Sequence, residues 1–325
     1  MTGRNGQDSV LTIGIDVGGT SIRAAAVDRN GVVVDSTRTQ TPSSAVALEN
    51  ALQRLVDHLR DRNDVAAVGL AVAGFLTEDR TTVRFAPHLP WTETPLAAIL
   101  TARLGLPVVL EHDANAAAWA EYRFGAAAGS RIAVMLALGT GIGAALLLDG
   151  RIYRGAYGVA PELGHLRIVP EGRPCPCGKR GCWERYCSGT GLVDTTVEML
   201  AAAPGRSALA ADVASDPGSL TGRRIAGAAH DGDPVALAAF ADFARRLGMG
   251  LALVADVYDP ELVVIGGGVS DSAPLFLDDA REHYAAATTG AGHRPLARVR
   301  VAQLGDAAGL IGAADLARRA VPDRP

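Results

Sequence analysis

The sequence predicts an α/β fold built from two related halves. Two observations lead to this prediction. Short apolar, β-branched runs alternate with segments of helical apolar spacing. One strand–turn–strand pattern also occurs twice, with matching residues 121 positions apart, as Asp28 and Asp149 are. The composition agrees, because 48% hydrophobic and 20% charged residues are ordinary for a globular protein and 325 residues suffice for about two domains.

The regular elements follow from local patterns. Segments rich in β-branched and apolar residues are expected strands: Val10–Ile15, Ile22–Val27, Gly31–Val34, Val65–Val72, Pro107–Leu110, Ile132–Leu138, Ile142–Leu148, Glu261–Ile265 and Ala297–Val301. Segments with apolar residues on one helical face are expected helices: Ala45–Leu59, Ala114–Phe124, Val235–Val257 and Ala307–Ala320. The segment Ala203–Thr221 lacks a strong period and is expected to be a loop or a weak helical connection.

Charge and hydropathy exclude several classes of protein. The 31 basic and 35 acidic side chains give a net charge of −4, and no basic stretch is present, so nucleic-acid binding is not expected. No apolar run approaches the roughly 18 residues of a membrane span. The N-terminal segment Met1–Asp8 is polar and lacks the apolar core of a signal peptide, so we expect a cytoplasmic protein.

The repeated pattern places a Gly/Thr turn after a strand in each half. The first turn comprises Gly18, Gly19 and Thr20, and the second comprises Gly139, Thr140 and Gly141. Glycines with positive φ let backbone N–H groups approach an anion, so both turns are candidate phosphate-binding sites. Asp16 ends the first strand and is placed to hold a metal ion through water. Neither turn fits the P-loop or the dinucleotide-binding motif.

A third glycine run, Gly266, Gly267 and Gly268, follows the expected strand at 261–265. Two interpretations stand equally: a plain strand-to-helix turn, or a close approach to an adenosine.

The four cysteines cluster between Cys175 and Cys187. In a reducing compartment such clustering favours a metal over disulfides. Cys175, Cys177 and Cys182 with His165 would complete a tetrahedral zinc site, and the competing set replaces His165 with Cys187.

Together these motifs resemble the ROK family of bacterial sugar kinases, and within it the actinobacterial ATP-dependent glucokinases. The resemblance covers nearly the whole chain. Its most specific part is Glu162-Leu-Gly-His165 followed by Cys175-Pro-Cys-Gly-Lys-Arg-Gly-Cys-Trp-Glu184. It implies a two-lobed actin-like, ribonuclease-H-like ATPase fold. The expected lobes are residues 1–118 with the C-terminal helix 306–325, and residues 119–305 with the zinc loop 165–184.

The resemblance also implies roles for individual residues. Asp113, in Asp-Ala-Asn, corresponds to the catalytic base, and at a probable N-cap it would be favoured in the ionised form. Glu162, His165 and Glu184 match the residues that contact the sugar. The family favours His165 as the fourth ligand of a structural Zn²⁺, while ATP with Mg²⁺ supplies the phosphoryl group.

The sequence departs from the family at two positions that face the sugar, where His88 and His112 replace the usual Asn. These changes suggest either plain glucose or an amino sugar such as kanosamine (3-amino-3-deoxyglucose) as substrate. Ser21 replaces a common Lys, and Arg23 is a candidate to supply that charge. Pro161, before Glu162, also departs from the family.

Two other functions are weighed against an ATP-dependent hexose 6-kinase. Polyphosphate-dependent glucokinases typically lack the cysteine cluster that this chain has. Sugar-responsive ROK repressors carry a winged-helix domain before the first Gly-Gly-Thr motif, whereas 15 residues precede Asp16 here. Members of the family often assemble, so we expect a homodimer or a larger homo-oligomer.

Overall fold

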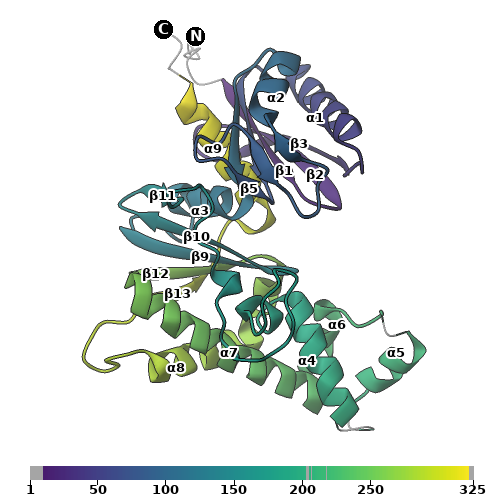
Figure 1. Cartoon of the computed structure of the whole chain (residues 1–325), viewed down its shortest axis with the longest axis vertical. Coiled ribbons are helices and arrows are strands. Elements are labelled where there is room, and N and C mark those ends of the chain that lie inside the picture. The colour runs from purple at the N-terminus through teal and green to yellow at the C-terminus, as the bar shows by residue number, and fades with distance from the viewer. Residues whose placement is uncertain (1–9, 203–204, 206, 217, 322–325) are drawn as a thin grey trace, which may run out of the picture. The chain divides into compact units, whose positions relative to one another are not determined.

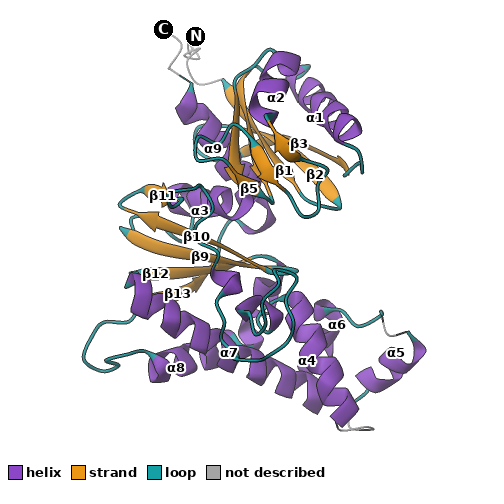
Figure 2. Cartoon of the chain, in the orientation of Figure 1, coloured by secondary structure: helices purple, strands orange, loops and turns teal. Residues whose placement is uncertain are grey.

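The structure is a computed structural model that describes residues 10–321, apart from positions 203, 204, 206 and 217. The segment Met1–Asp8 and the last four residues of the expected C-terminal helix lie outside the described residues. The described chain is a mixture of helices and strands, which confirms the predicted α/β class (Figure 1; Figure 2). It forms two compact units, one of residues 1–129, 145–161 and 303–325 and one of residues 130–144 and 162–302. The expected lobe boundaries stay a prediction.

The first unit is built on a five-stranded sheet with the order β3-β2-β1-β4-β8. β1 pairs antiparallel with β2, which pairs antiparallel with β3, whereas β1, β4 and β8 run parallel. The strands are β1 (Leu11–Val17), β2 (Ser21–Val27), β3 (Val33–Gln40), β4 (Val65–Val72) and β8 (Val108–His112). The helices are α1 (Ala45–Arg60), α2 (Leu96–Leu104), α3 (Asp113–Phe124) and α9 (Ala308–Ala320).

Alternation along β2 divides the core of this unit between the two faces of the sheet. Ile22 and Ala24 join the core beneath α1 and α2, whereas Ala25 and Val27 join the core beneath α3 and α9. Missing side chains allow α9 to come very close: a Cβ on Gly14 of β1 would lie 1.8 Å from the carbonyl oxygen of Leu310. Helix α9, near the C-terminal end of the chain, therefore packs directly against β1.

The loop between β4 and α2 carries a small sheet that the sequence patterns do not predict. Its strands are β5 (Phe75–Leu76), β6 (Val83–Phe85) and β7 (Thr92–Thr94), in the order β5-β6-β7. Strands of two or three residues are too short for alternation to be recognised. The segment after β6 carries His88.

The other five-stranded sheet has the order β11-β10-β9-β12-β13, and the boundary between the compact units passes through β10. β9, β12 and β13 run parallel, and β10 pairs antiparallel with β11. These strands are β9 (Ile132–Leu138), β10 (Ile142–Leu148), β11 (Arg151–Tyr153), β12 (Leu262–Gly266) and β13 (Arg298–Val301).

The second unit also holds a helical layer, in which the long helix α7 packs against α4, α6 and α8. The helices are α4 (Gly189–Ala202), α5 (Leu209–Ser215), α6 (Gly222–His230), α7 (Pro234–Tyr258) and α8 (Leu277–Ala287). The 3₁₀ turns η1 (Leu163–His165), η2 (Trp183–Arg185) and η3 (Gly268–Leu275) lie in this unit, and η4 (Gly305–Ala307) lies in the first. α5 shows that the expected weak connection at 203–221 contains a short helix.

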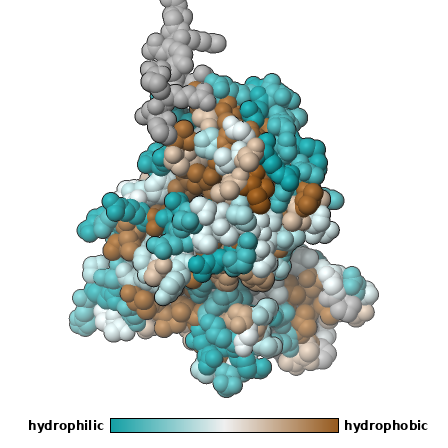
Figure 3. Space-filling view, turned by 45° about the horizontal axis from the view of Figure 1, so that its top comes forward, coloured by the Kyte–Doolittle hydropathy of each residue, from teal (hydrophilic) through white to brown (hydrophobic). Residues whose placement is uncertain are grey.

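On the face drawn in Figure 3, hydrophobic residues lie in patches separated by hydrophilic ones. Among the described residues, no helix has both the length and the apolarity needed to cross a membrane.

Candidate active site and metal centre

Asp113 lies where strand β8 passes directly into helix α3. It is the first residue of α3, and the N-cap position belongs to His112. The expectation that Asp113 is the N-cap is therefore wrong, because no loop residue separates strand and helix. The Asp113 carboxylate is 42% exposed, accepts the N–H of Ala114 at 2.7 Å through Oδ1, and has that oxygen 3.2 Å from Nε2 of His112. The carboxylate of Asp113 is thus exposed at the end of β8.

The first Gly/Thr turn lies between β1 and β2 and is closed by backbone bonds. The N–H of Gly18 donates to Ser21, and Thr41 bonds the carbonyls of Gly18 and Thr20. Neither Gly18 nor Gly19 has positive φ, contrary to the expected use of these glycines. Glycine is required at position 19 for space instead, because a Cβ there would lie 2.9 Å from the Cβ of His88. The structure therefore places His88, an exposed residue, against this turn.

Asp16 precedes the turn and pairs with Arg23 across the β1–β2 hairpin, at 2.5 Å between Oδ2 and Nη2. Burial raises the pKa of Asp16, Arg23 partly offsets this, and the charges of Asp113 and Asp306 add to the rise. A carboxylate oxygen is a ligand that suits Mg²⁺ held through water, so Asp16 fits the expected role.

The second Gly/Thr turn joins β9 to β10 in the second unit. The Gly139 carbonyl accepts the N–H of Gly189, at the start of α4, at 2.7 Å. A Cβ on Gly141 would lie 2.6 Å from Oε2 of Glu184. The turn therefore has the first residue of a 14-residue helix on one side and a candidate sugar-binding carboxylate on the other.

The third glycine run follows β12 and lies beside the second turn. Gly267 has φ of +79°, and a Cβ there would lie 2.5 Å from the carbonyl oxygen of Leu138. Both observations explain on structural grounds why this turn has glycine at position 267. Gly266 ends β12 and Gly268 begins η3, so the run connects a buried strand to a surface turn.

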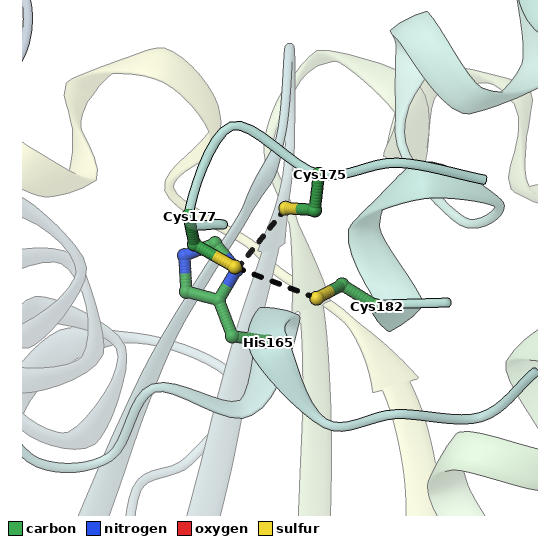
Figure 4. Close-up of side chains that lie close together, drawn as sticks. All are labelled: His165, Cys175, Cys177 and Cys182. Atoms are coloured by element: carbon green, nitrogen blue, oxygen red, sulfur yellow. Dashed lines mark hydrogen bonds between the residues drawn. The ribbon is translucent and has the colours of Figure 1, made fainter. Parts of the chain in front are cut away.

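His165, Cys175, Cys177 and Cys182 come together as one cluster, whose ligand atoms all lie within 4.8 Å of one another (Figure 4). Cys177 Sγ lies 3.6 Å from Cys182 Sγ, and Cys175 Sγ lies 3.7 Å from Nδ1 of His165. A tetrahedron with Zn–S bonds of about 2.3 Å has edges of about 3.8 Å, so the set fits zinc. Cys187 is buried elsewhere, with Sγ directed to the Phe243 carbonyl at 3.6 Å, so the structure favours His165 over Cys187.

The thiols of the cluster differ in how readily they ionise. Burial raises the pKa of Cys175 and of Cys182. Burial acts the same way on Cys177, but hydrogen bonds from the Lys179 N–H and the two other thiols outweigh it and lower the pKa of Cys177. Cys177 is therefore the thiol best prepared to give a thiolate ligand.

Glu184 connects the metal cluster to the second turn. Its Oε1 accepts from Cys175 Sγ at 3.1 Å and lies 3.4 Å from Nδ1 of His165, and its Oε2 faces Gly141. Glu162 is exposed at the start of η1, where its carbonyl accepts the His165 N–H at 3.1 Å. The metal cluster, the turn and the Glu184 carboxylate thus form one continuous region of the second unit, and the backbone of Glu162 adjoins it.

The predicted site residues fall into two groups. One unit contains Asp16, the turn at 18–20, His88, His112 and Asp113; His88 lies against the turn, and His112 lies beside Asp113. The other unit brings together the turn at 139–141, Gly266–Gly268, Glu162, His165, Glu184 and the cysteines. Glu111, a buried carboxylate next to His112, carries a dense set of contacts that sequence reasoning missed, because a single acidic residue at a strand end gives no sign of its burial.

A family model described as the ROK family matches residues 12–320. The glucokinase of Streptomyces coelicolor is 44% identical over 313 residues, which are 96% of this chain and 99% of that protein. The chain is also similar to the crystal structure of a ROK family glucokinase from Streptomyces griseus in complex with glucose and AMPPNP, with a TM-score of 0.86 and 44% sequence identity. That match covers 95% of this chain and 99% of the Streptomyces griseus chain. A ROK hexokinase from Thermus thermophilus has a TM-score of 0.77 and 32% identity over 97% of this chain and 100% of its own.

Proposed function

Because the chain belongs to the ROK family, we propose that it is an ATP-dependent hexose kinase that phosphorylates the 6-hydroxyl of a gluco-configured hexose. One observation carries the proposal: over almost its whole length the chain is similar to a glucokinase whose crystal structure holds glucose and AMPPNP. The actin-like fold of that kinase is the fold that the resemblance predicts. The candidate phosphate turns and carboxylates are all present in the described chain.

In the proposed mechanism, Asp113 is the general base. Its Oδ1 is held by the Ala114 N–H and faces His112, so Oδ2 is the oxygen that accepts the proton of the sugar hydroxyl. As the proton leaves, the sugar oxygen forms a bond to the γ-phosphorus and the bond to the ADP oxygen breaks. Such a transfer needs positioning and charge stabilisation more than covalent catalysis. The exposed position of Asp113 supports this role.

The Gly/Thr turns at 18–20 and 139–141 are proposed to bind the phosphates through backbone N–H groups. Mg²⁺, when bound, neutralises charge on the phosphates, and Asp16 would hold it through water. Arg23 is proposed to balance Asp16 rather than to contact phosphate, because its guanidinium is already paired with that carboxylate. Gly266–Gly268 are proposed to shape the adenosine side of the site from a turn that is itself structural.

Glu162, His165 and Glu184 are proposed to bind the sugar, with the metal as an organiser of their loop. Carboxylates suit sugars because they accept from two hydroxyls at once. His165 directs Nδ1 toward the thiols, so its other nitrogen is the one available to a ligand. With three thiolates and one imidazole the proposed Zn²⁺ has no open coordination position, so its role is structural.

The identity of the sugar is the finer part of the proposal. Glucose is the first candidate, on the strength of the comparisons. Kanosamine is the second, favoured by His88 and His112 in place of the usual Asn. A coupled ADP-release assay with glucose, kanosamine, glucosamine, mannose and N-acetylmannosamine tests both, and repeating it with polyphosphate tests the alternative donor. Turnover of none of these sugars with ATP would overturn the proposed function.

A further inference from the structure

Glu111 is a charged side chain placed almost entirely out of solvent, with 2% of its side chain exposed. It is the residue of β8 just before His112 and Asp113. Its Oε1 accepts the backbone N–H of His112 at 3.1 Å and Nδ2 of Asn115 at 3.0 Å. One carboxylate oxygen therefore bonds the N-cap residue and the third residue of α3.

These two bonds tie the start of α3 to the strand that precedes it. The N-cap residue His112 makes no capping bond with its own side chain, and within the first turn Asp113 Oδ1 accepts the N–H of Ala114. Glu111 adds a restraint from the preceding strand, on the backbone of His112 and the side chain of Asn115. Asp113 lies between the two bonded residues, so the direction of its carboxylate depends on how firmly this turn is held.

The second oxygen of Glu111 is neutralised by a distant part of the chain. Arg154, just after β11, donates from Nη2 to Oε2 at 2.5 Å and from Nε to Oε2 at 3.1 Å. Arg80 adds a second positive charge, with Nη1 at 3.6 Å from Oε2. A buried carboxylate without a partner strongly destabilises the folded protein, so the pairing with Arg154 favours this position of Glu111.

We propose that Glu111, paired with Arg154, is a positioning residue for phosphoryl transfer, because together they hold the first turn of α3 and aim the Asp113 carboxylate. The proposal rests on the proposed role of Asp113 as base. Glu111 touches neither substrate nor the reacting atoms; it acts through the backbone of His112 and the side chain of Asn115. Arg154 also fixes its own loop, since its carbonyl accepts the N–H of Ala160 at 3.0 Å.

The experiment compares kcat, KM for glucose and the thermal midpoint among variants of the full chain. Glu111→Gln and Arg154→Met each remove one member of the pair, and Arg154→Lys keeps the charge without the fork. Asp315→Asn is the matched control: Asp315 is a buried carboxylate of the same unit, bonded to Nε1 of Trp119 at 2.8 Å and to Arg319 at 3.1 Å, and it has no place in the proposed machinery.

Misaligning a base by about 1 Å costs roughly 100-fold in rate, so Glu111→Gln and Arg154→Met should lower kcat by about 10- to 100-fold. KM should change less than kcat, because the proposed sugar contacts of Glu162, His165 and Glu184 stay. Arg154→Lys should recover part of kcat. The double variant should be no slower than the worse single one, because both act through one pair. Asp315→Asn should lower the thermal midpoint while kcat stays within about twofold of the wild type.

A kcat that falls no further than in Asp315→Asn would overturn the positioning role. If Glu111→Gln fails to fold, Arg154→Lys and Asn115→Ala carry the same test, and normal kcat in both would overturn the proposal. The two proposals fail differently. Wild-type protein that turns over no hexose removes the proposed function and this inference with it. Active wild type, inactive Asp113→Asn and fully active Glu111 and Arg154 variants remove the inference alone.

Discussion

The Nε2 atom of His112 lies 3.2 Å from Oδ1 of Asp113, so the ring of a candidate sugar-binding residue faces the carboxylate of the candidate base. The same oxygen accepts the Ala114 N–H at 2.7 Å. His112 and Asp113 are therefore close enough to influence each other. A substitution at 112 changes the surroundings of the base as well as any contact with a sugar, whereas His88 packs against Gly19.

Asp113→Asn tests the base directly, because it keeps the shape of the side chain and removes the proton acceptor. A positioned general base contributes roughly 10²- to 10⁴-fold, so kcat should fall by about that factor. Binding of glucose, measured by calorimetry, should change little. A near-normal kcat in this variant would remove Asp113 from the role.

Histidine variants should separate specificity from rate. The double variant His88→Asn, His112→Asn should raise kcat/KM for glucose relative to kanosamine by roughly tenfold for each lost bond of about 1.4 kcal/mol. The two single variants show which histidine is responsible for which part of this change. His112→Asn should change kcat for both sugars, since it touches Asp113, whereas His88→Asn should change mainly their ratio. A parent enzyme that strongly prefers glucose, with an unchanged ratio in the double variant, would make both histidines neutral replacements.

Much of the fold could be predicted because buried parallel strands give continuous apolar runs, as β4 and β9 do. The sequence patterns do not predict α8 because Asp278 and Asp279 in its first turn and its other polar residues obscure the helical spacing of apolar residues. α4 was missed because it begins with Gly189-Thr190-Gly191, a combination typical of turns.

The candidate site was predictable where the motif is local, as in the ligand cluster between His165 and Cys182. The site could not be predicted where two residues in contact lie far apart in the sequence. Arg154 lies 43 positions from Glu111, and nothing in either neighbourhood marks the pair. His88 and Gly19 show the same limit, since their contact depends on how the small sheet after β4 folds.

The metal cluster should hold one zinc per chain by elemental analysis. Cys177→Ser should lose the metal and weaken sugar binding together, because Glu184 bonds Cys175 and the loop is ordered through the cluster. Cys187→Ser is the matched control: its sulfur faces the Phe243 carbonyl and not the cluster, so this variant should keep the zinc. Full occupancy in Cys177→Ser, or unchanged activity after chelation of the zinc, would contradict the coupling.

The pH dependence of stability should reveal an ion-pair cluster on α7 that supports the zinc loop. Asp242 accepts from Arg245 and Arg246, both at 2.6 Å, and the Arg246 guanidinium stacks 4.3 Å from the centre of the Tyr186 ring. Burial raises the pKa of Asp242, but the hydrogen bonds and charges of Arg246 and Arg245 outweigh it, so the pKa lies below its ordinary value.

A carboxyl group with a lowered pKa binds protons more weakly in the folded chain than in the unfolded chain. Its stabilising effect is therefore fully present at neutral pH, above the ordinary Asp pKa of about 3.9, and is lost as the pH falls through that value toward the folded pKa. Asp242→Asn should lower the thermal midpoint at pH 7 by the equivalent of roughly 0.5–1 kcal/mol. At pH 4 the gap between wild type and variant should narrow.

Scanning calorimetry at the two pH values measures this gap, with Asp278→Asn as the control. Asp278 also pairs with an arginine three positions later, Arg281, but its side chain is 91% exposed, so that variant should differ little from wild type at either pH. A gap for Asp242→Asn that is constant from pH 7 to pH 4 would show that its side chain stabilises the helix by packing and not by its charge.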